Sequence, residues 1–337
     1  MVSKCQYFED YEVGQTGFTR TRTVGEPEIV NFACITCDYS YVHLAHHSTM
    51  DGPYGGRVAH GLLGTSLVSG LLSLDAPHLV GRDVPGSYLY AFDANYRDAI
   101  RLGETIKIAW TVSDKKDDQN QRNYGIIRSD FKVLTQDDKA VYDGNLLLKV
   151  QKRSAGEEVF TLLDFDSPTP WEINEFPFEP EKIYYLEDFR VGEGGITSGR
   201  TITETDIINF AGLTGDYNPL YVDDQYAKES PFKGRIVPGL LAFTMGFGLW
   251  TRDSIALRAK SDESSNDAGH LNDSSVFHRP AKIGDTIHTV YKIEETRVSR
   301  TKPDLGIIRY GFQMLNQRDE VVQQGKTLMM RSTSKMT

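Results

Sequence analysis

The stretch FEDYEVGQTGFTRTRTVGEPEIVNFA, residues 8–33, occurs a second time in this chain in altered form. Moved forward by 178 positions, it falls without a gap on LEDFRVGEGGITSGRTITETDIINFA, residues 186–211. Further on, GPYGGRVAHGLL at residues 52–63 falls on SPFKGRIVPGLL at residues 230–241. A repeat of this length indicates one fold used twice.

Later in the chain the offset between the copies becomes 181, because YRDAIRLGETI at residues 96–106 matches FHRPAKIGDTI at residues 277–287. The three extra residues fall in the polar run SDESSNDAGHLNDSS, residues 261–275, which we predict to be a loop. Residues between the copies are acidic and rich in proline, as in a linker. The sequence therefore predicts a first domain over residues 1–152, a linker over 153–183 and a second domain over 184–337.

Both copies show the same order of predicted elements. Residues 26–36 place apolar side chains at helical spacing, with Pro27 near the start. Residues 61–72 are apolar nearly all round, which predicts a buried helix. Residues 105–114 and 123–134 alternate in the manner of strands. We therefore predict an α+β protein in which a curved antiparallel sheet wraps a buried helix, made twice, with the two sheets paired so that their edges are hidden.

Composition and charge exclude several classes of protein. A net charge of −10 argues against a general nucleic-acid binder, which needs clustered lysine and arginine. The longest near-apolar run, residues 236–250, is too short to span a membrane. The first residues lack the apolar segment of a secretory signal, and three cysteines are too few for a disulfide framework. These features predict a cytoplasmic protein without nucleic-acid or membrane partners.

Chemically active side chains gather in CITCDYSYVHLAHH, residues 34–47. Asp38 could cap a helix or act as a base, and His43 could pack in the interior or act beside Asp38. His46 and His47 follow His43 at a spacing seen in metal sites, but no acidic or cysteine partner stands at a recognised spacing. We therefore predict no metal and no other cofactor.

Cys34 and Cys37 form a C-x-x-C pair, which can be a redox motif when a βαβ unit surrounds it. No such unit is predicted here. The corresponding residues of the second copy are Gly212 and Gly215, both small. We therefore interpret the two cysteines as small residues packed beneath the loop that carries Asp38.

The second copy reads GDYNPLY at residues 215–221, and this motif resembles the MaoC-like hydratase family. That family's signature is an aspartate, then Asn-Pro two residues on, a histidine at the aspartate plus five, and a glycine about 23 residues after the aspartate. Gly61 follows Asp38 by 23 residues, and Gly239 follows Asp216 by the same distance. The resemblance spans nearly all of both copies and implies a tandem, or double, hotdog fold.

Each copy departs from the signature in a different way. The first keeps Asp38 and His43 but has Ser40 and Tyr41 in place of Asn-Pro. The second keeps the Asp-Asn-Pro part but has a tyrosine where the histidine belongs. The resemblance implies that one copy keeps the chemistry and the other makes room for the substrate, and we expect the first to be catalytic. The second-copy candidates are Asp216, Asn218, Tyr221 and Gly239.

The resemblance implies a hydro-lyase that adds water to 2-enoyl thioesters or removes it from 3-hydroxyacyl thioesters. Asp38 would activate the water, His43 would hold it, and the N–H of Gly61 would stabilise the enolate oxygen. Ser40 could replace the family's asparagine as a donor. The further substrate-binding candidates are Tyr41, His60, Arg57, Arg97 and Arg101.

Three functions remain open at this stage. The first is a hydratase or dehydratase acting on a thioester of coenzyme A or of acyl carrier protein. The second is a non-catalytic acyl-thioester-binding protein, suggested by the loss of part of the signature in each copy. The third is a recruited dehydratase or cyclase acting on a bulky biosynthetic intermediate, suggested by Tyr39, Tyr41 and Tyr221. A homodimer is a further possibility, since hotdog sheets commonly pair.

Overall fold

The computed structural model describes residues 7–52, 54–82, 86–154, 167–177, 182, 184–253 and 269–334. The predicted linker over 153–183 and the predicted loop over 261–275 therefore lie partly outside the described residues. The helices are α1 (Glu26–Thr36), α2 (Tyr41–Leu44), α3 (His46–Thr49), α4 (Gly61–Asp75), α5 (Glu204–Thr214), α6 (Pro219–Val222), α7 (Asp224–Glu229) and α8 (Gly239–Asp253).

The strands repeat the same plan in each half. The first half contains β1 (Thr16–Phe18), β2 (Arg22–Thr23), β3 (Tyr88–Tyr96), β4 (Thr105–Asp117), β5 (Tyr124–Thr135) and β6 (Ala140–Gln151). The short β7 (Asn174–Glu175) comes between the two halves in sequence and forms one edge of the sheet in space. The second half contains β8 (Glu193–Ile196), β9 (Arg200–Thr201), β10 (Gly269–Phe277), β11 (Thr286–Val298), β12 (Leu305–Leu315) and β13 (Val321–Ser332).

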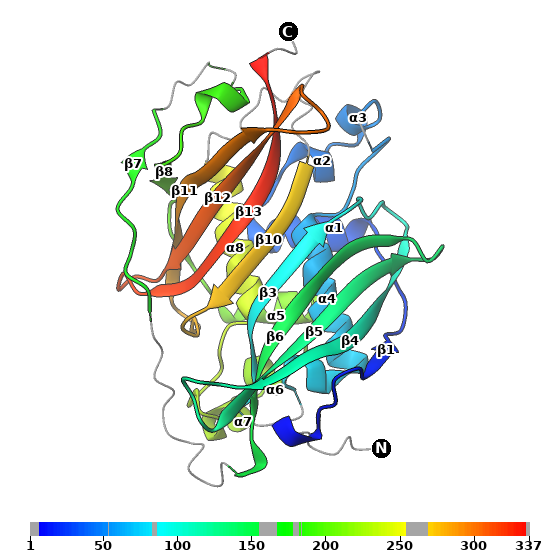
Figure 1. Cartoon of the computed structure of the whole chain (residues 1–337), viewed down its shortest axis with the longest axis vertical. Coiled ribbons are helices and arrows are strands. Elements are labelled where there is room, and N and C mark those ends of the chain that lie inside the picture. Colours follow the sequence, from blue (N-terminus) through cyan, green and yellow to red (C-terminus); the bar gives the residue numbers. More distant parts are fainter. Residues whose placement is uncertain are drawn as a thin grey trace.

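The strands of both halves form one sheet (Figure 1). Its order is β1-β4-β5-β6-β3-β10-β13-β12-β11-β8-β7, with β2 on β4 and β9 on β11. The halves meet where β3 pairs antiparallel with β10, from Asn95 opposite Asn272 to Ala91 opposite Val276. This junction removes one edge strand from each half, as predicted.

A long buried helix lies against the sheet in each half. Residues Leu62 to Ser73 of α4 are all buried, which explains why this helix is apolar nearly all round. Its counterpart α8 is buried from Leu240 to Trp250. The prediction of an α+β fold with a buried helix against an antiparallel sheet, made twice, is confirmed. None of the described helices combines the length and the apolar character needed to cross a membrane.

The predicted loop over residues 261–275 is wrong for its second part. Residues from Gly269 onward belong to β10, a central strand between β3 and β13. This segment lacks the apolar alternation of an ordinary strand because several of its polar side chains are buried against partners from distant parts of the chain. Asp273, for example, is wholly buried and accepts a hydrogen bond from Tyr96.

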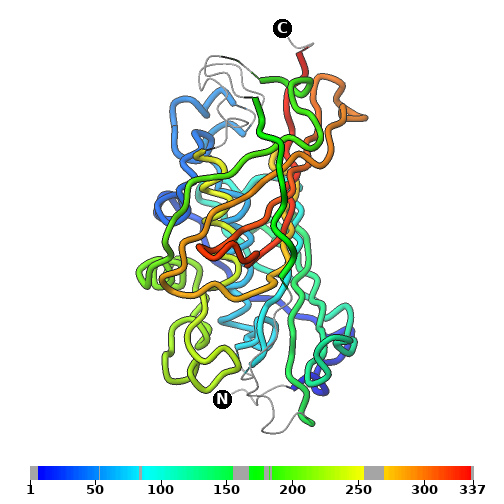
Figure 2. The backbone as a smooth tube through the Cα atoms, turned by 90° about the vertical axis from the view of Figure 1, so that its left-hand side faces the viewer, coloured from blue at the N-terminus to red at the C-terminus, as the bar shows by residue number. Residues whose placement is uncertain are grey.

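Each buried helix also supports the other half of the molecule. A Cβ atom at Gly248, on α8, would collide with the carbonyl of Thr36 at the end of α1. The equivalent Gly70, on α4, stands in the same relation to the carbonyl of Thr214 at the end of α5. In Figure 2 the helical segments of both halves lie to one side of the strands. The loop after α1 is thus held by a helix from the opposite half.

Candidate active site

A cavity of about 540 Å³ lies between the two halves. The first half contributes the consecutive residues 37–43 together with Gly61 and Tyr96. The second half contributes side chains from α8, β10 and β13, among them Phe247, Arg252, His270, Met329 and Arg331. The lining is more apolar than polar, as is typical of pockets for small molecules, but it also includes Asp38, Asp98, Arg97, Arg252 and Arg331.

Asp38 is brought into this cavity by the way α1 ends. The helix stops at Thr36, and Cys37 takes a left-handed conformation with φ of 70°, which turns the chain inward. The Asp38 side chain is buried and accepts two hydrogen bonds at Oδ1, from the Ser40 hydroxyl at 2.5 Å and the Ser40 N–H at 3.2 Å. Ser40 therefore orients the carboxylate and satisfies one of its oxygens.

His43 lies on the short helix α2, and its ring is fixed from two directions. Its Nδ1 is 2.9 Å from the carbonyl oxygen of Val58, so Nδ1 carries the proton and Nε2 is the acceptor. The ring stacks on that of His60, with centroids 3.7 Å apart and an interplanar angle of 30°. Because Val58 fixes the tautomer, His43 presents a lone pair and no proton at Nε2.

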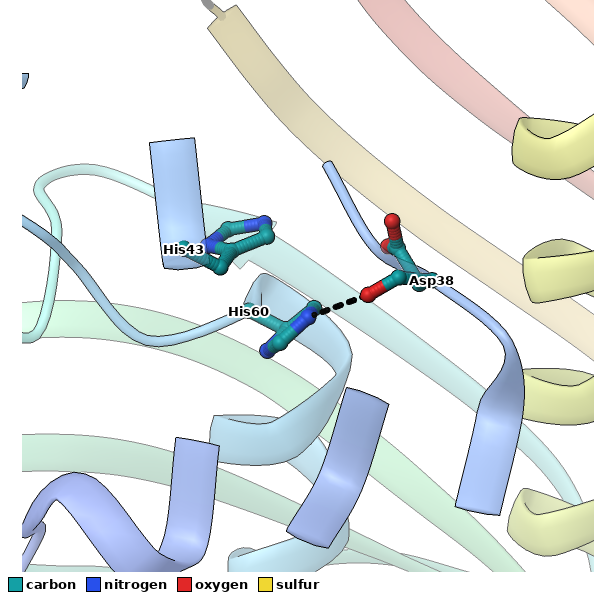
Figure 3. Close-up of side chains that lie close together, drawn as sticks. All are labelled: Asp38, His43 and His60. Atoms are coloured by element: carbon teal, nitrogen blue, oxygen red, sulfur yellow. Dashed lines mark hydrogen bonds between the residues drawn. The ribbon is translucent and has the colours of Figure 1, made fainter. Parts of the chain in front are cut away.

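His60 contacts both Asp38 and His43 and holds them in place. Its Nε2 donates to the backbone oxygen of Asp38 at 3.0 Å, which ties the start of α4 to the loop after α1. Its own ring is buried and does not line the cavity, and the described part of the chain offers no hydrogen-bond partner for its Nδ1. In Figure 3 the Asp38 carboxylate and the His43 ring lie to the same side of this hydrogen bond.

The surroundings of Asp38, His43 and His60 shift their pKa values and so decide which of them is charged at neutral pH. Burial raises the pKa of the Asp38 carboxyl, but the neighbouring His60 and His43 rings and the hydrogen bonds from Ser40 outweigh it, so the pKa lies below the ordinary value. Burial lowers the pKa of His43 to about 3, and proximity to His60 acts in the same direction. Burial also lowers the pKa of His60. At neutral pH the site therefore holds an ionised carboxylate beside two uncharged imidazoles.

Asp38, His43 and His60 also form the one group of at least three possible metal ligands found among the described residues. One ligand atom from each of them lies within 4.8 Å of the other two. This trio differs from the His43, His46 and His47 set weighed from the sequence. Two of its imidazole nitrogens already contact backbone carbonyls of Val58 and Asp38. The same spacing suits a water molecule held between the carboxylate and an imidazole nitrogen.

Gly61 begins α4 and lines the cavity. As the first residue of a helix it has no intrahelical acceptor for its N–H, and no other acceptor for it occurs within the described ranges. A Cβ atom at this position would lie 3.0 Å from two carbons of the Tyr96 ring. A side chain here would therefore press on the Tyr96 ring.

The remaining first-copy candidates divide into two groups. Ser40, Tyr41 and Arg97 line the cavity. Arg57 does not, and it forms an ion pair with Glu26 at 3.1 Å. Arg101 also lies outside the cavity lining and is paired with Asp98 at 3.7 Å.

None of the second-copy candidates lines the cavity. Asp216 is buried and accepts a hydrogen bond from Ser69 at 2.8 Å, and burial raises the pKa of its carboxyl. Asn218 caps α6 through the N–H of Leu220. Tyr221 is buried, and burial raises the pKa of its hydroxyl well above the ordinary value. A Cβ atom at Gly239 would collide with the ring of Phe277.

Sequence reasoning missed the cavity residues of the second half. Phe247 and Arg252 lie on α8, and His270 lies on β10. The repeat contains a partial signal for them, because their first-copy counterparts Ser69, Leu74 and Leu89 differ in size and polarity. That difference becomes meaningful only when the packing of one half against the other is known.

Comparison with known proteins agrees with this architecture. The family model described as "MaoC like domain" matches residues 11–130 and 190–311. A 3-hydroxybutyryl-CoA dehydratase of Methylorubrum extorquens is 29% identical over 151 residues, which are 45% of this chain and 88% of that protein. An (R)-specific enoyl-CoA hydratase of Rhodospirillum rubrum is 35% identical over 105 residues, which are 31% of this chain and 66% of that protein.

Solved structures support the same conclusion for the fold. A putative MaoC domain protein dehydratase of Chloroflexus aurantiacus superposes with a TM-score of 0.77 at 16% identity, covering 99% of both chains. A conserved hypothetical protein of Mycobacterium tuberculosis, described as a double hotdog, superposes with a TM-score of 0.71 at 14% identity, covering 97% of this chain and 98% of that one. The chain therefore belongs to the MaoC-like domain family, with the domain present twice in a double hotdog fold.

Proposed function

We propose that this protein is a hydro-lyase that hydrates 2-enoyl thioesters and dehydrates 3-hydroxyacyl thioesters at Asp38 and His43. The observation that carries the proposal is the pairing of an ionised carboxylate with an uncharged imidazole at the wall of a largely apolar cavity. The hydratase and dehydratase activities named for the two bacterial relatives support the same class of reaction.

The geometry suits the addition of water across a double bond. A water held between Oδ2 of Asp38 and Nε2 of His43 would lose one proton as its oxygen bonds to C3 of the enoyl group. A proton delivered to C2 completes the addition, and dehydration is the reverse. The Asp38 carboxylate is the base that orients and activates the water, and His43 holds the water and assists the transfer of protons. The Val58 carbonyl fixes His43 in the tautomer that can accept from this water.

Negative charge develops on the thioester oxygen while C2 is an enolate carbon. The N–H of Gly61 is proposed to donate to that oxygen, supported by the positive end of the helix dipole of α4. Removal of one such donor typically lowers the rate by about 10²–10³. Absence of a side chain at residue 61 also lets the thioester approach the backbone closely.

We propose a CoA ester as the substrate, because both relatives are named for CoA esters. Of the arginines predicted from the sequence for a phosphate contact, Arg97 is the one that lines the cavity; its side chain is 60% exposed and paired with Asp143 at 2.6 Å. Arg57 suits this role less well, because its side chain is only 11% exposed and lies outside the cavity lining. A thioester of acyl carrier protein is the alternative carrier.

Two alternatives remain from the sequence. A non-catalytic binder would use the same cavity for an acyl thioester without turnover. A recruited enzyme acting on a bulky ring would use Tyr39 and Tyr41, which line the cavity, but Tyr221 does not reach it. The ionised Asp38 beside an uncharged His43 favours the hydro-lyase over both.

The direct test is a spectrophotometric assay of 2-enoyl-CoA hydration over several chain lengths and branched acids. We expect turnover by the wild-type protein and a fall of about 10²–10⁴ in kcat for Asp38→Asn, with the thermal midpoint preserved. Wild-type turnover that is equalled by the Asp38→Asn variant would remove Asp38 from the mechanism. Saturable binding of the same esters without any turnover would favour the binder.

A further inference from the structure

A second polar cluster, separate from Asp38 and His43, borders the same cavity. Asp273 on β10 is wholly buried, and its two carboxylate oxygens have different partners. Oδ2 accepts from the Tyr96 hydroxyl at 2.7 Å, and Oδ1 lies 2.9 Å from Nε2 of His270. Tyr96 and His270 line the cavity, whereas Asp273 lies behind them. A buried carboxylate is kept only with such partners, so the three side chains form one unit.

The contacts of this cluster decide which nitrogen of His270 carries the proton. A carboxylate can only accept, so Nε2 must donate to Asp273. Thr327 is 3.0 Å from the same nitrogen, and its own hydroxyl proton is directed to the carbonyl of Asn272, so Thr327 also accepts. In the neutral imidazole, Nδ1 of His270 is then the acceptor, and it has no partner among the residues that the structure describes.

Aromatic rings hold His270 in this orientation. The ring of Phe247 stacks on it, with centroids 5.1 Å apart and an interplanar angle of 11°. The ring of Tyr96 lies against it at 4.7 Å. Because Asp273 and these rings fix the imidazole of His270, which lines the cavity, its Nδ1 is a preorganised acceptor.

The repeat shows which residue types the fold accepts at the positions of this cluster. At the offset of 181 residues, His270 corresponds to Leu89, Asp273 to Phe92 and Tyr96 to Phe277. These counterparts are apolar, and the rings of Phe92 and Phe277 lie 6.2 Å apart. The two strands β3 and β10 therefore form two equivalent sites, one filled by the apolar side chains of Leu89, Phe92 and Phe277 and the other, beside the cavity, by the polar unit. Folding alone does not explain the polar unit.

From this juxtaposition we propose that the His270–Asp273 pair recognises a hydroxyl group on the acyl chain of the substrate, which donates a hydrogen bond to Nδ1 of His270. The inference rests on the proposed function of the cavity and narrows its substrates to acyl thioesters that carry a hydroxyl group besides the one added to or removed from C3. A purely aliphatic acyl group would cover Nδ1 of His270 without donating a hydrogen bond to it. Leaving this buried acceptor unpaired lowers the affinity of the protein for the thioester by about tenfold or more. A neutral hydroxyl is favoured over a carboxylate because the Asp273 anion lies directly behind the imidazole.

Binding of saturated thioesters tests this proposal without depending on catalysis, because these compounds have no double bond to hydrate. Calorimetry with the whole chain would compare 4-hydroxybutyryl-CoA with butyryl-CoA and 5-hydroxyvaleryl-CoA with valeryl-CoA. We expect at least one hydroxylated ester to bind about tenfold tighter than its unsubstituted partner. Equal binding within both pairs would overturn the proposal. A preference shown only for succinyl-CoA would also overturn it, since the site would then select an anion.

Two variants connect any preference to the cluster. His270→Leu introduces the residue type of the first copy and should abolish the preference for the hydroxyl. Because this variant leaves Asp273 with fewer partners, a triple variant H270L/D273F/Y96F supplies the complete apolar set found at the equivalent site, which is formed by Leu89, Phe92 and Phe277. Retention of the preference in folded protein of either variant would contradict the assignment to His270. Enoyl-CoA turnover by the wild type, measured separately, tests the hydro-lyase proposal, so each idea can fail without the other.

Discussion

The hydroxyl of Ser69, on α4 of the first half, donates a hydrogen bond of 2.8 Å to Oδ2 of Asp216, which follows α5 in the second half. At the corresponding position of the first half's site stands Phe247, which lines the cavity together with Asp38. Two aspartates in equivalent places of a repeat thus have different surroundings. One is closed off by its neighbours, and the other faces a space large enough for a small molecule.

This difference predicts that Asp216→Asn preserves activity. Burial raises the pKa of Asp216 above its ordinary value of 3.8, so the folded state binds this proton more tightly than the unfolded state. The contribution of wild-type Asp216 to stability is therefore greatest below about pH 4 and is lost as the pH rises. We expect the Asn variant to be at least as stable as wild type at pH 7, and its advantage to shrink toward pH 4.

Thermal midpoints across that pH range, measured beside enoyl-CoA turnover, provide the check. The matched control is Asp38→Asn at the equivalent position. A loss of turnover in Asp216→Asn as large as in the control would mean that the second copy takes part in the chemistry.

The acid side of the pH profile gives a second prediction. His43 has a pKa lowered to about 3, and that of Asp38 is also below its ordinary value. Both groups work in their deprotonated forms, so log kcat/KM should stay level from pH 8 down to about pH 5 and fall only in more acidic solution. An acid limb centred between pH 6 and 7 that disappears in His43→Gln would contradict these assignments.

Ser40→Ala is expected to impair catalysis by changing Asp38. The variant removes the 2.5 Å hydrogen bond that stabilises the ionised carboxylate and fixes its orientation. The pKa of Asp38 should therefore rise toward its ordinary value, and kcat should fall roughly tenfold. Ser40→Thr keeps the hydroxyl and should retain most of the activity. A Ser40→Ala profile that coincides with wild type at every pH would exclude this role.

Alanine at the two helix-start glycines should have different effects. In Gly61→Ala the new Cβ lies 3.0 Å from the Tyr96 ring and next to the proposed oxyanion N–H, so we expect a large fall in kcat with modest loss of stability. In Gly239→Ala the Cβ collides with Phe277 away from the cavity, so we expect a loss of about 1–3 kcal/mol in the free energy of unfolding with kcat retained. Urea denaturation and steady-state kinetics on both variants separate the two effects. Equal kinetic losses in both would argue against a special role for Gly61.

Much of the fold follows from residues that are close in sequence. The apolar pattern of residues 61–72 predicts α4, and alternation predicts β4 and β5. The interior of β10 escapes this reasoning because Asp273 depends on Tyr96, 177 residues away in the chain. A buried polar residue satisfied by so distant a partner cannot be distinguished from a loop residue by local pattern.

In the candidate site, too, some features follow from local sequence and others depend on contacts between distant segments. The spacing between Asp38 and His43 predicts that they lie close together, because only residues 37–40 connect α1 to α2. The spacing cannot show that Arg57 is already paired with Glu26. Nor can it show that Phe247, Arg252 and His270 complete the wall, because their arrival depends on how α8 and β10 pack against the first half. Those contacts arise between segments that no local pattern connects.

The pairing of β3 with β10 has a consequence for the activity of the protein at low concentration. Both walls of the pocket belong to a single polypeptide, so their encounter is unimolecular and their effective concentration does not change when the sample is diluted. An assembly of two separate chains would lose the pocket as it dissociated, whereas here specific activity should be constant down to nanomolar protein.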